Sequence, residues 1–466
     1  MPQLAVGNKH NNYHEPAKET LYLDEVPARV ARIHFDGLDR TKDDVLKKIS
    51  QDLLSATNFQ DMVIKAQEVR GKLSNLNAFQ GIGITVDSND DDDLNYDITF
   101  HVAEKRRVQG SVLTEFSAQN SGSINTGLLL PNVHGRGESV KLAYTYGNKC
   151  SAGFDVLFSK PLLPWTDQNP NLQLSAFQKG FANPWNGLTE VNRGSYVGLS
   201  GKLNELITGS MYLNCNVTSL SATGIETPFR ARMESGHFLK TSINTSVVFD
   251  SRNSTSLPTR GNLVKWSSEL SGLLKSGNVN FFKNELELQS NVSTLAGLIV
   301  FQSTLKTGLI TSLLSPSVSP KLVLSDDSHV PINERFSLGG PLSLRGYAIN
   351  GIGPHDGWAN LGGNAYWVFG AHVYTPLPFA SHLKNLVRFH IFFNSGSIES
   401  IDLKKTNDLI SSLSANVRKS VGTGIVLSFG SARLELNYSF PIPSSAATGQ
   451  DRLDSGIQFG IGATFT

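Results

Sequence analysis

Few side chains in this sequence are spaced for catalysis. The motifs G-x-S-x-G and G-x-x-x-x-G-K-[ST] are absent, and Gly351 and Gly353 are followed by Asp356 where a dinucleotide-binding loop needs its third glycine. The eleven His form no H-E-x-x-H zinc motif. A rim site of carboxylates or of Ser and His, as in barrel proteases and lipases, stays open because chain order does not exclude it. We predict that the protein is not an enzyme and has no catalytic residue, metal or cofactor.

Two other groups could bind a metal ion, and we interpret both differently. Cys150 and Cys215 are too few and too far apart for a thiolate site or a disulfide framework, so we expect two unrelated thiols. The acidic stretch 87–93 could form a calcium loop, but it lacks the central glycine and terminal glutamate of an EF-hand. We expect a solvated hairpin tip there.

One non-catalytic constellation stands out at residues 335–347, which read RFSLGGPLSLRGY. This segment is too rich in turn formers to be a strand. We predict a long loop that folds into the lumen of a β-barrel, where the guanidinium of Arg345 needs an anionic partner. Glu435, on the polar face of a late strand, is the partner that we predict. The alternative is a surface loop with a solvent-exposed Arg345.

The strands that would hold this loop are indicated by apolar and polar residues that alternate from about residue 108 onward. A soluble β-sandwich also alternates. Here, however, one face is apolar with aromatic ends and the other is polar or glycine on strand after strand, as in a barrel with lipid outside and water inside. The apolar faces are clearest at Val140, Leu142, Tyr144 and Tyr146, at Leu434, Leu436, Tyr438 and Phe440, and at Ile457, Phe459, Ile461, Ala463 and Phe465.

Composition agrees with a membrane barrel. Charged residues make up 17% of the 466 residues, whereas roughly 25% is usual for a soluble chain. No run of about 18 apolar residues indicates a transmembrane helix. Allowing about 22 residues per strand and connection gives about 16 strands. We therefore predict a mainly β fold in which residues 106–466 form an antiparallel transmembrane β-barrel, with the lumenal loop around residues 335–360.

Residues 28–105 show a different pattern and predict a small α/β domain of order β-α-α-β-β. A strand at 30–35 precedes a helix whose start resembles a capping box at Thr41 and Asp44. A second helix places four apolar side chains on one face, and two alternating strands follow it. The four side chains are Met62, Ala66, Val69 and Leu73.

Residues 1–27 form a polar N-terminal tail of mixed charge. The tail lacks the apolar core of a secretory signal and the Arg-rich, acid-poor character of a matrix transit peptide. This favours an organelle outer membrane that is reached from the cytosol; the alternative is a processed N-terminus, which would lack a signal in the same way. The net charge of +1 produces no field that would attract nucleic acid.

The sequence resembles the outer-membrane β-barrel assembly family, and specifically its mitochondrial branch, the core subunits of the sorting and assembly machinery (SAM), which are related to bacterial BamA. Members have one or more β-α-α-β-β domains, called POTRA domains, before a 16-stranded barrel whose lumenal loop carries the motif [VIL]-R-G-[FY]. Leu344, Arg345, Gly346 and Tyr347 match that motif. Further similar segments are residues 35–38, 40–44, 130–132, 250–254, 361–363, 374–379 and 432–438.

This resemblance implies an insertase that folds β-barrel precursors and inserts them into the mitochondrial outer membrane through a lateral gate between the first and last barrel strands. Arg345 would brace the lumenal loop through Glu435, Gly346 would let the backbone turn, and Tyr347 would pack against the wall. The POTRA-like domain would lie in the intermembrane space. The implied partners are barrel precursors, the lipid bilayer, metaxin-like SAM subunits and the cristae-organising MICOS complex, and no nucleic acid.

The last strand resembles the C-terminal signal of barrel precursors, polar-x-Gly-x-x-hydrophobic-x-hydrophobic, in Gln458, Gly460, Ala463 and Phe465. Its glycines would weaken local pairing, which suits a strand that must unzip, or they mark only a bend or tight packing.

Two other functions remain open. A passive porin-like channel would share the alternation but needs neither a POTRA-like domain nor an R-G-Y loop. A polypeptide-secretion pore would have both, but it should carry a secretory signal.

Overall fold

The computed structural model describes residues 26–89, 92–116, 122–148, 150–162, 170–272, 277, 279–294, 297–313, 330–377, 383, 386–401, 407–429, 432–442 and 451–463. The chain divides into two compact units between Lys105 and Arg106.

The first unit is a three-stranded sheet with two α-helices, in the predicted order β-α-α-β-β. Its strands follow the order β1-β3-β2, with β1 parallel and β2 antiparallel to β3, so β1 and β2 are the edges of this sheet. The elements are β1 (Arg29–Asp36), α1 (Asp43–Ser50), the 3-10 helix η1 (Gln51–Ser55), α2 (Phe59–Asn75), β2 (Phe79–Asn89) and β3 (Asp92–Glu104).

The two helices of this unit begin in different ways. Helix α2 has a side-chain cap, because the amide oxygen of Asn58 accepts a 2.7 Å hydrogen bond from the backbone N–H of Asp61. Helix α1 begins at Asp43 after Lys42 and has no side-chain cap. The predicted capping box at Thr41 is therefore wrong. The Thr41 hydroxyl donates instead to Glu104, 2.6 Å away at the end of β3.

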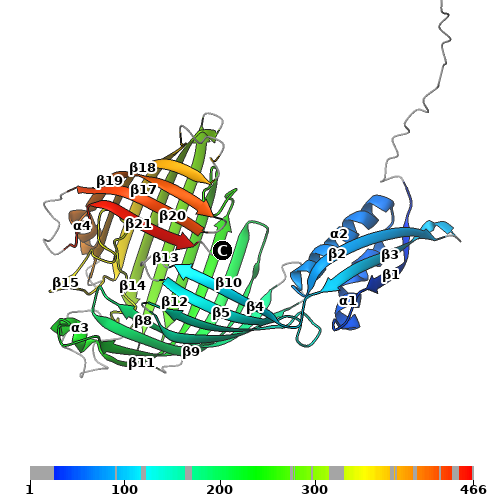
Figure 1. The fold of residues 1–466 in the computed structure, drawn as a ribbon, viewed down its shortest axis with the longest axis horizontal. Helices are drawn as coiled ribbons and strands as arrows, with labels where there is room; N and C mark the ends of the chain where they lie inside the picture. Colours follow the sequence, from blue (N-terminus) through cyan, green and yellow to red (C-terminus); the bar gives the residue numbers. More distant parts are fainter. Residues whose placement is uncertain are drawn as a thin grey trace, which may run out of the picture. The chain divides into compact units, whose positions relative to one another are not determined.

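The second unit is a sixteen-stranded antiparallel barrel, which confirms the predicted fold class (Figure 1). Neighbours in the sheet are consecutive in sequence except where a long loop separates β14 from β17. The strands are β4 (Gln109–Phe116), β5 (Gly122–Leu130), β6 (Ser139–Gly147), β7 (Cys150–Pro161), β8 (Asn171–Asn183), β9 (Leu188–Lys202), β10 (Ile207–Ala222), β11 (Gly236–Asp250), β12 (Gly261–Ser271), β13 (Phe281–Thr294), β14 (Ile299–Ser312), β17 (Ala365–Pro376), β18 (Val387–Glu399), β19 (Arg418–Phe429), β20 (Ala432–Ile442) and β21 (Gly456–Ala463).

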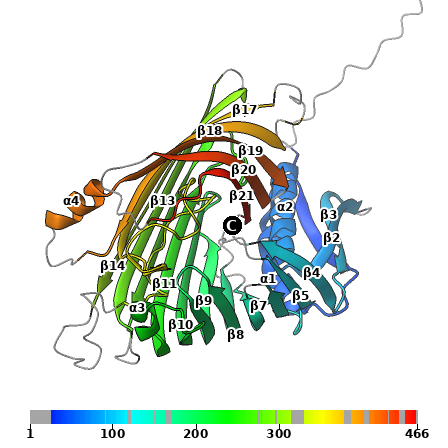
Figure 2. The same cartoon turned by 60° about the vertical axis from the view of Figure 1, so that its left-hand side comes forward.

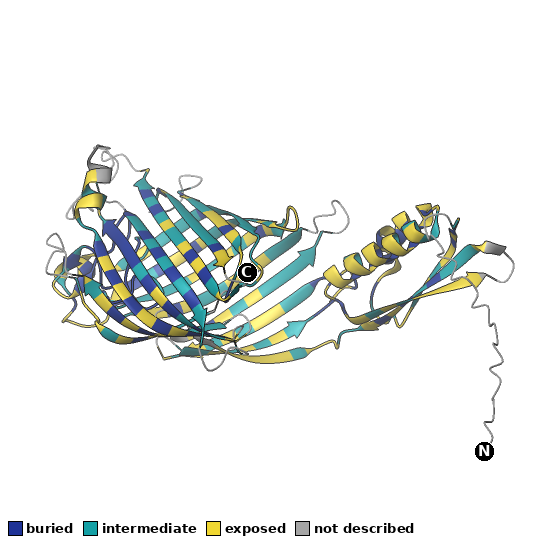
Figure 3. Cartoon of the chain, turned by 90° about the horizontal axis from the view of Figure 1, so that it is seen from above, coloured by how far each residue is buried: buried dark blue, intermediate teal, exposed yellow. Residues whose placement is uncertain are grey.

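Most strands of the barrel alternate between a more buried lumenal face and a more exposed outer face (Figure 3). On β20, Leu436 and Tyr438 are each 49% exposed on the outside, whereas Glu435 and Asn437 are at most 2% exposed on the lumenal side. This is the division that the two-residue period predicts.

Two short helices lie in loops at the strand ends, α3 (Phe229–Met233) and α4 (Asn407–Ala415). Within the described ranges, no helix has the length and apolar character needed to cross a membrane.

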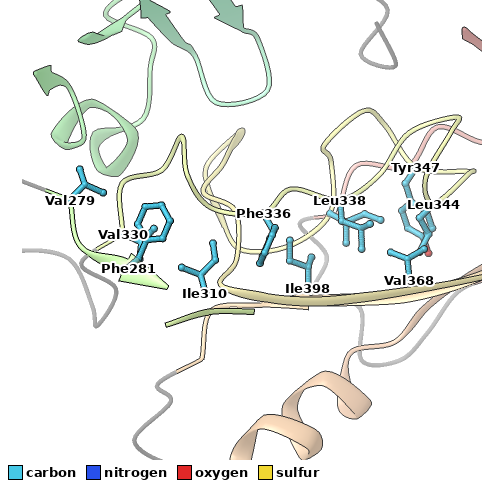
Figure 4. Close-up of a cluster of buried hydrophobic side chains, with 11 residues drawn as sticks. Val279, Phe281, Ile310, Val330, Phe336, Leu338, Leu344, Tyr347, Val368 and Ile398 are labelled. Carbon is cyan, nitrogen blue, oxygen red and sulfur yellow. The ribbon is translucent and has the colours of Figure 1, made fainter. Parts of the chain in front are cut away.

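The loop between β14 and β17 packs against the inner wall of the barrel. We call its described part, residues 330–364, the lumenal loop. It contains a small hairpin of β15 (His355–Asp356) and β16 (Ala359–Asn360). Buried side chains of the loop and of the wall form one apolar cluster (Figure 4). The loop contributes Val330, Phe336, Leu338, Leu344, Tyr347 and Ile352, and the strands and their connections contribute Val279, Phe281, Ile310, Val368 and Ile398.

Candidate functional site

The centre of the candidate site is a buried ion pair between the lumenal loop and β20. Arg345 donates from Nη2 and Nε to Glu435 Oε2, at 2.6 and 3.2 Å. The Arg345 side chain is 5% exposed and that of Glu435 is 2% exposed. Arg345 also donates from Nη1 to Asn394 Oδ1 at 3.3 Å, and its guanidinium lies 4.9 Å from the ring centre of Phe392. The loop cation is therefore enclosed by the wall.

The carboxylate of Glu435 is shared between the loop and its own strand. Arg433 Nε donates to Oε1 at 2.6 Å, while Asn437 Nδ2 donates to Oε2 at 2.9 Å. Arg433 also donates to the hydroxyl of Tyr374 on β17 at 2.7 Å. Two guanidinium groups on one carboxylate keep Glu435 ionised, and the loop arginine and the wall arginine occupy different oxygens.

The residues on either side of Arg345 pack against the barrel wall, near β19 and β20. Leu344 is fully buried in the apolar cluster. Gly346 has φ +85°, a conformation that L side chains rarely adopt, and a Cβ there would lie 3.1 Å from the backbone nitrogen of Pro441. Tyr347 is 3% exposed and donates from its hydroxyl to the carbonyl of Lys419 at 3.4 Å. The motif thus turns the chain tightly against the wall.

Gln458 on β21 links the last strand directly to the loop motif. Its Oε1 accepts from the backbone N–H of Gly346 at 2.8 Å, and its Nε2 donates to the carbonyl of Tyr347 at 3.0 Å. Gln458 is 3% exposed. The sequence placed Gln458 in a strand signal and gave no indication that it binds the loop backbone.

Gly460 and Gly462 of β21 lie close to Pro341 and Leu342, which form the loop tip. A Cβ at Gly460 would lie 3.1 Å from Pro341 Cβ and 3.1 Å from Leu342 Cδ2, and one at Gly462 would lie 2.9 Å from Leu342 Cδ1. The absence of side chains therefore lets the loop tip lie on the strand. Ala463 ends the strand, and its side chain and the whole of Phe465 fall outside the described residues.

The two ends of the barrel sheet meet at a seam. The sheet order runs from β21 to β4, and Cα atoms of these two strands come within 8 Å of each other (Figure 2). Within the described parts of both strands, no ladder of hydrogen bonds joins them. Each therefore presents backbone donors and acceptors without a strand partner along one side.

A second polar anchor holds the beginning of the lumenal loop to the opposite wall, and sequence reasoning missed it. Lys240 on β11 lies 2.7 Å from Glu334 of the loop and 3.2 Å from Glu269 on β12. Arg335 binds Glu234, beside α3, at 2.8 Å. The available signal was the adjacent pair Glu334 and Arg335 in a loop expected to be buried, because buried charges need partners.

The other candidate groups do not assemble into a site. Within the ranges that the structure describes, no group of three or more His, Cys, Asp or Glu side chains could hold a metal ion. Cys215 is a free, exposed thiol, and the side chain of Cys150 is outside the described set. The tip of the acidic hairpin, residues 90–91, also lies outside it.

A sixteen-stranded antiparallel barrel with a loop locked into its lumen by a buried arginine and carboxylate defines a class of outer-membrane-type β-barrel proteins. The chain belongs to the Omp85 superfamily, because the model of the Omp85 superfamily domain matches residues 132–465. This confirms the resemblance seen in the sequence.

Individual relatives are similar over nearly the whole chain. The chain is 36% identical over 463 residues to the "Sorting and assembly machinery component 50 homolog" of Bos taurus, which covers 97% of this chain and 93% of the relative. The human protein of the same name gives the same identity and coverage. A SAM50-like protein of Drosophila melanogaster is 30% identical over 461 residues, covering 96% of this chain and 98% of the relative.

Among solved structures, the chain resembles BamA from Haemophilus ducreyi lacking POTRA domains 1–3, with a TM-score of 0.73 and 18% identity, covering 94% of this chain and 85% of that one. At this identity the likeness concerns the fold alone.

Proposed function

We propose that this protein folds β-barrel precursors and inserts them into the mitochondrial outer membrane. The observation that carries the proposal is the seam between β4 and β21, where the described residues form no ladder and the lumenal loop is docked against one side. The similarity to sorting and assembly machinery component 50 relatives over 97% of the chain supports it.

The mechanism follows from the cost of unpaired backbone groups in lipid. A seam that opens sideways presents a strand edge inside the bilayer, where water cannot satisfy its N–H and C=O groups. An incoming precursor strand can pair with that edge and satisfy both chains. In this mechanism β21, with Gln458, Gly460 and Ala463 of the signal-like sequence that ends at Phe465, occupies the position that the C-terminal signal strand of a precursor would take over.

The lumenal loop would keep one side of the seam in place during this exchange. Arg345 joins the loop to β20 through Glu435, and Gln458 joins it to β21. With the other end of the loop held by Lys240 and Glu334, the loop connects the seam to the opposite wall. This arrangement favours an assembly factor over a passive channel, because the loop occupies the lumen that a channel would keep open.

The front unit would lie in the intermembrane space and receive arriving precursors by strand addition. Its sheet has two edge strands, β1 and β2, since β3 is paired on both sides. An extended peptide can hydrogen-bond to such an edge. We further propose that the barrel works with metaxin-like SAM subunits and with the MICOS complex.

An import assay with isolated mitochondria tests the proposal. The protein is depleted, a labelled porin precursor is imported, and its assembly is followed on native gels beside a helical outer-membrane protein as the control. We expect porin assembly to fail while the helical control inserts normally. Normal porin assembly would reject the insertase function and leave a porin-like channel or a polypeptide-secretion pore.

A further inference from the structure

Two histidines that no part of the proposed mechanism uses lie behind the Arg345 and Glu435 pair. His372 on β17 and His390 on β18 are 5% and 0% exposed on the lumenal side of the wall. Their rings are stacked, with centroids 5.6 Å apart and an interplanar angle of 3°. Tyr374 stacks on His390 at 5.3 Å. Such buried imidazoles need hydrogen-bond partners, and their partners connect them to the carboxylate of Glu435.

The hydrogen bonds form a chain that ends at the loop arginine. His372 Nδ1 lies 3.4 Å from His390 Nδ1, and His390 Nε2 lies 2.8 Å from Asn437 Oδ1. Asn437 Nδ2 then donates to Glu435 Oε2 at 2.9 Å, the same oxygen that Arg345 binds at 2.6 Å.

The direction of this chain is determined by the carboxylate. An ionised carboxylate only accepts, so the NH₂ group of Asn437 must face Glu435 and its carbonyl oxygen must face His390. His390 must therefore donate from Nε2. Without that donor the carbonyl oxygen of Asn437 would be buried without a partner, the amide would no longer be held in place from both sides, and Glu435 could turn towards Arg433, its other arginine.

The wall is shaped to leave room for this bond. Gly424 on β19 lies opposite, and a Cβ there would be 2.2 Å from Asn437 Oδ1 and 2.8 Å from His390 Nε2. Gly370 leaves similar room beside His372, where a Cβ would be 3.2 Å from Nε2. A larger residue at Gly424 would disrupt the bond between His390 and Asn437, and one at Gly370 would press against the ring of His372.

We propose that His390 is a positioning residue for the lumenal loop. Its Nε2–H orients the amide of Asn437, Asn437 fixes Glu435, and Glu435 in turn holds Arg345 and the loop tip against β21. The inference rests on the proposed function only where it concerns precursor assembly, because loop docking can be measured separately.

Loop docking is read out by a cysteine pair at Leu342 and Gly462, whose side-chain positions adjoin. The full-length chain carries Leu342→Cys and Gly462→Cys, with Cys150 and Cys215 changed to serine, in mitochondria depleted of the native protein. Crosslinking after brief oxidation reports docking, and import of a labelled porin precursor reports assembly.

His390→Phe keeps a ring of similar size and removes the donor. We expect it to lower crosslinking and porin assembly about tenfold each, the order expected when one buried acceptor loses its donor. His390→Gln should restore both, because its amide nitrogen can donate from nearly the position of Nε2. His237→Phe, at an exposed histidine on β11, serves as the matched control and should change neither.

Each result is decisive. Unchanged crosslinking in His390→Phe would overturn the positioning role, and so would a His390→Gln chain that docks as poorly as the Phe variant. Reduced docking with unchanged porin assembly would support the positioning role and reject the part of the loop in assembly. If His390→Phe does not accumulate, Asn437→Ala interrupts the same chain from the other end and should lower docking equally.

Discussion

The three strands on either side of the seam are built differently. On the C-terminal side, lumenal residues of β20 and β21 are buried and bound to one another or to the loop, among them Glu435, Asn437, Ser439 and Gln458. On β4–β6, none of the residues whose burial is described is buried. One side of the seam is therefore held by side chains, and the other side depends on its backbone ladders.

This difference indicates which side can move. Opening β21 would require Gln458 to leave Gly346 and Tyr347, and Leu342 to leave the glycines of the strand. Displacing β4 requires no comparable loss of buried contacts. We therefore expect lateral opening to occur chiefly by movement of β4–β6 against a fixed C-terminal side.

The largest effect should come from Arg345→Ala. The change leaves Glu435 buried with only one arginine and releases the loop tip, and losing one partner of a buried pair costs about 3–5 kcal/mol. We expect the barrel to reach the membrane but porin assembly in mitochondria to fall at least about tenfold.

Lys141→Ala is the matched control for that change. Lys141 is an exposed cation on the lumenal face of β6, so its removal should leave porin assembly within about twofold of the native rate. If the two variants behaved alike, the contrast between the two sides of the seam would have no functional meaning.

Amide hydrogen exchange tests the contrast without any substitution. We expect β5 and β6 to exchange about tenfold faster than β19 and β20 in the purified protein in lipid nanodiscs, because few buried contacts oppose their opening. All four strands have a partner on both sides, so the comparison is free of edge effects. Equal rates would show that the loop does not stabilise its side of the barrel.

A smaller effect is expected from Gly460→Ala. The new methyl group would lie 3.1 Å from Pro341 and Leu342, and overpacking of this kind costs about 1–3 kcal/mol. The loop tip should become more accessible to protease, and assembly should slow a few-fold. Gly127→Ala on β5 is the control, since a Cβ there meets mainly the Ser111 hydroxyl, which can rotate. Equal protease sensitivity in the two variants would contradict the close packing of the loop on β21.

The alternation of residues was sufficient to predict much of the barrel. A period of two assigns Glu435 and Asn437 to one face and Leu436 and Tyr438 to the other, whatever the neighbouring strands are. The order of the front unit could be predicted for the same reason, since periodicity is local. The start of α1 could not, because the Thr41 hydroxyl has a competing acceptor in Glu104, 63 residues away.

The site was less accessible to sequence reasoning. Arg345 and Glu435 could be paired in advance because a buried cation in a loop needs an anion from a polar strand face. The bonds from Gln458 to the loop backbone and from Lys240 to Glu334 depend on where the loop crosses the barrel. That path is set by packing of the whole cluster around Phe336 and Leu344, and no local pattern encodes it.

In the front unit, the carboxylate of Glu104 accepts several hydrogen bonds, and its contribution to the stability of this unit should depend on pH. Burial would raise the pKa of Glu104, but hydrogen bonds from the Thr41 hydroxyl and from the backbone N–H groups of Arg40, Thr41 and Asp39 lower it to about 2, from an ordinary value of 4.5. Glu104 therefore binds a proton less tightly in the folded state than in the unfolded state. Its contribution to stability is complete above about pH 4.5 and disappears as the pH falls towards about 2.

Glu104→Gln should remove this dependence and have the smallest effect on assembly. The amide can no longer accept all of these bonds or pair with Arg40, so we expect the front unit to lose about 1–2 kcal/mol at pH 7. Limited proteolysis of the full-length protein in urea, at pH 7 and at pH 3, measures the difference for this unit. The native chain should weaken between the two pH values more than the variant does. If both weakened equally, carboxylates other than Glu104 would account for the acid sensitivity of this unit.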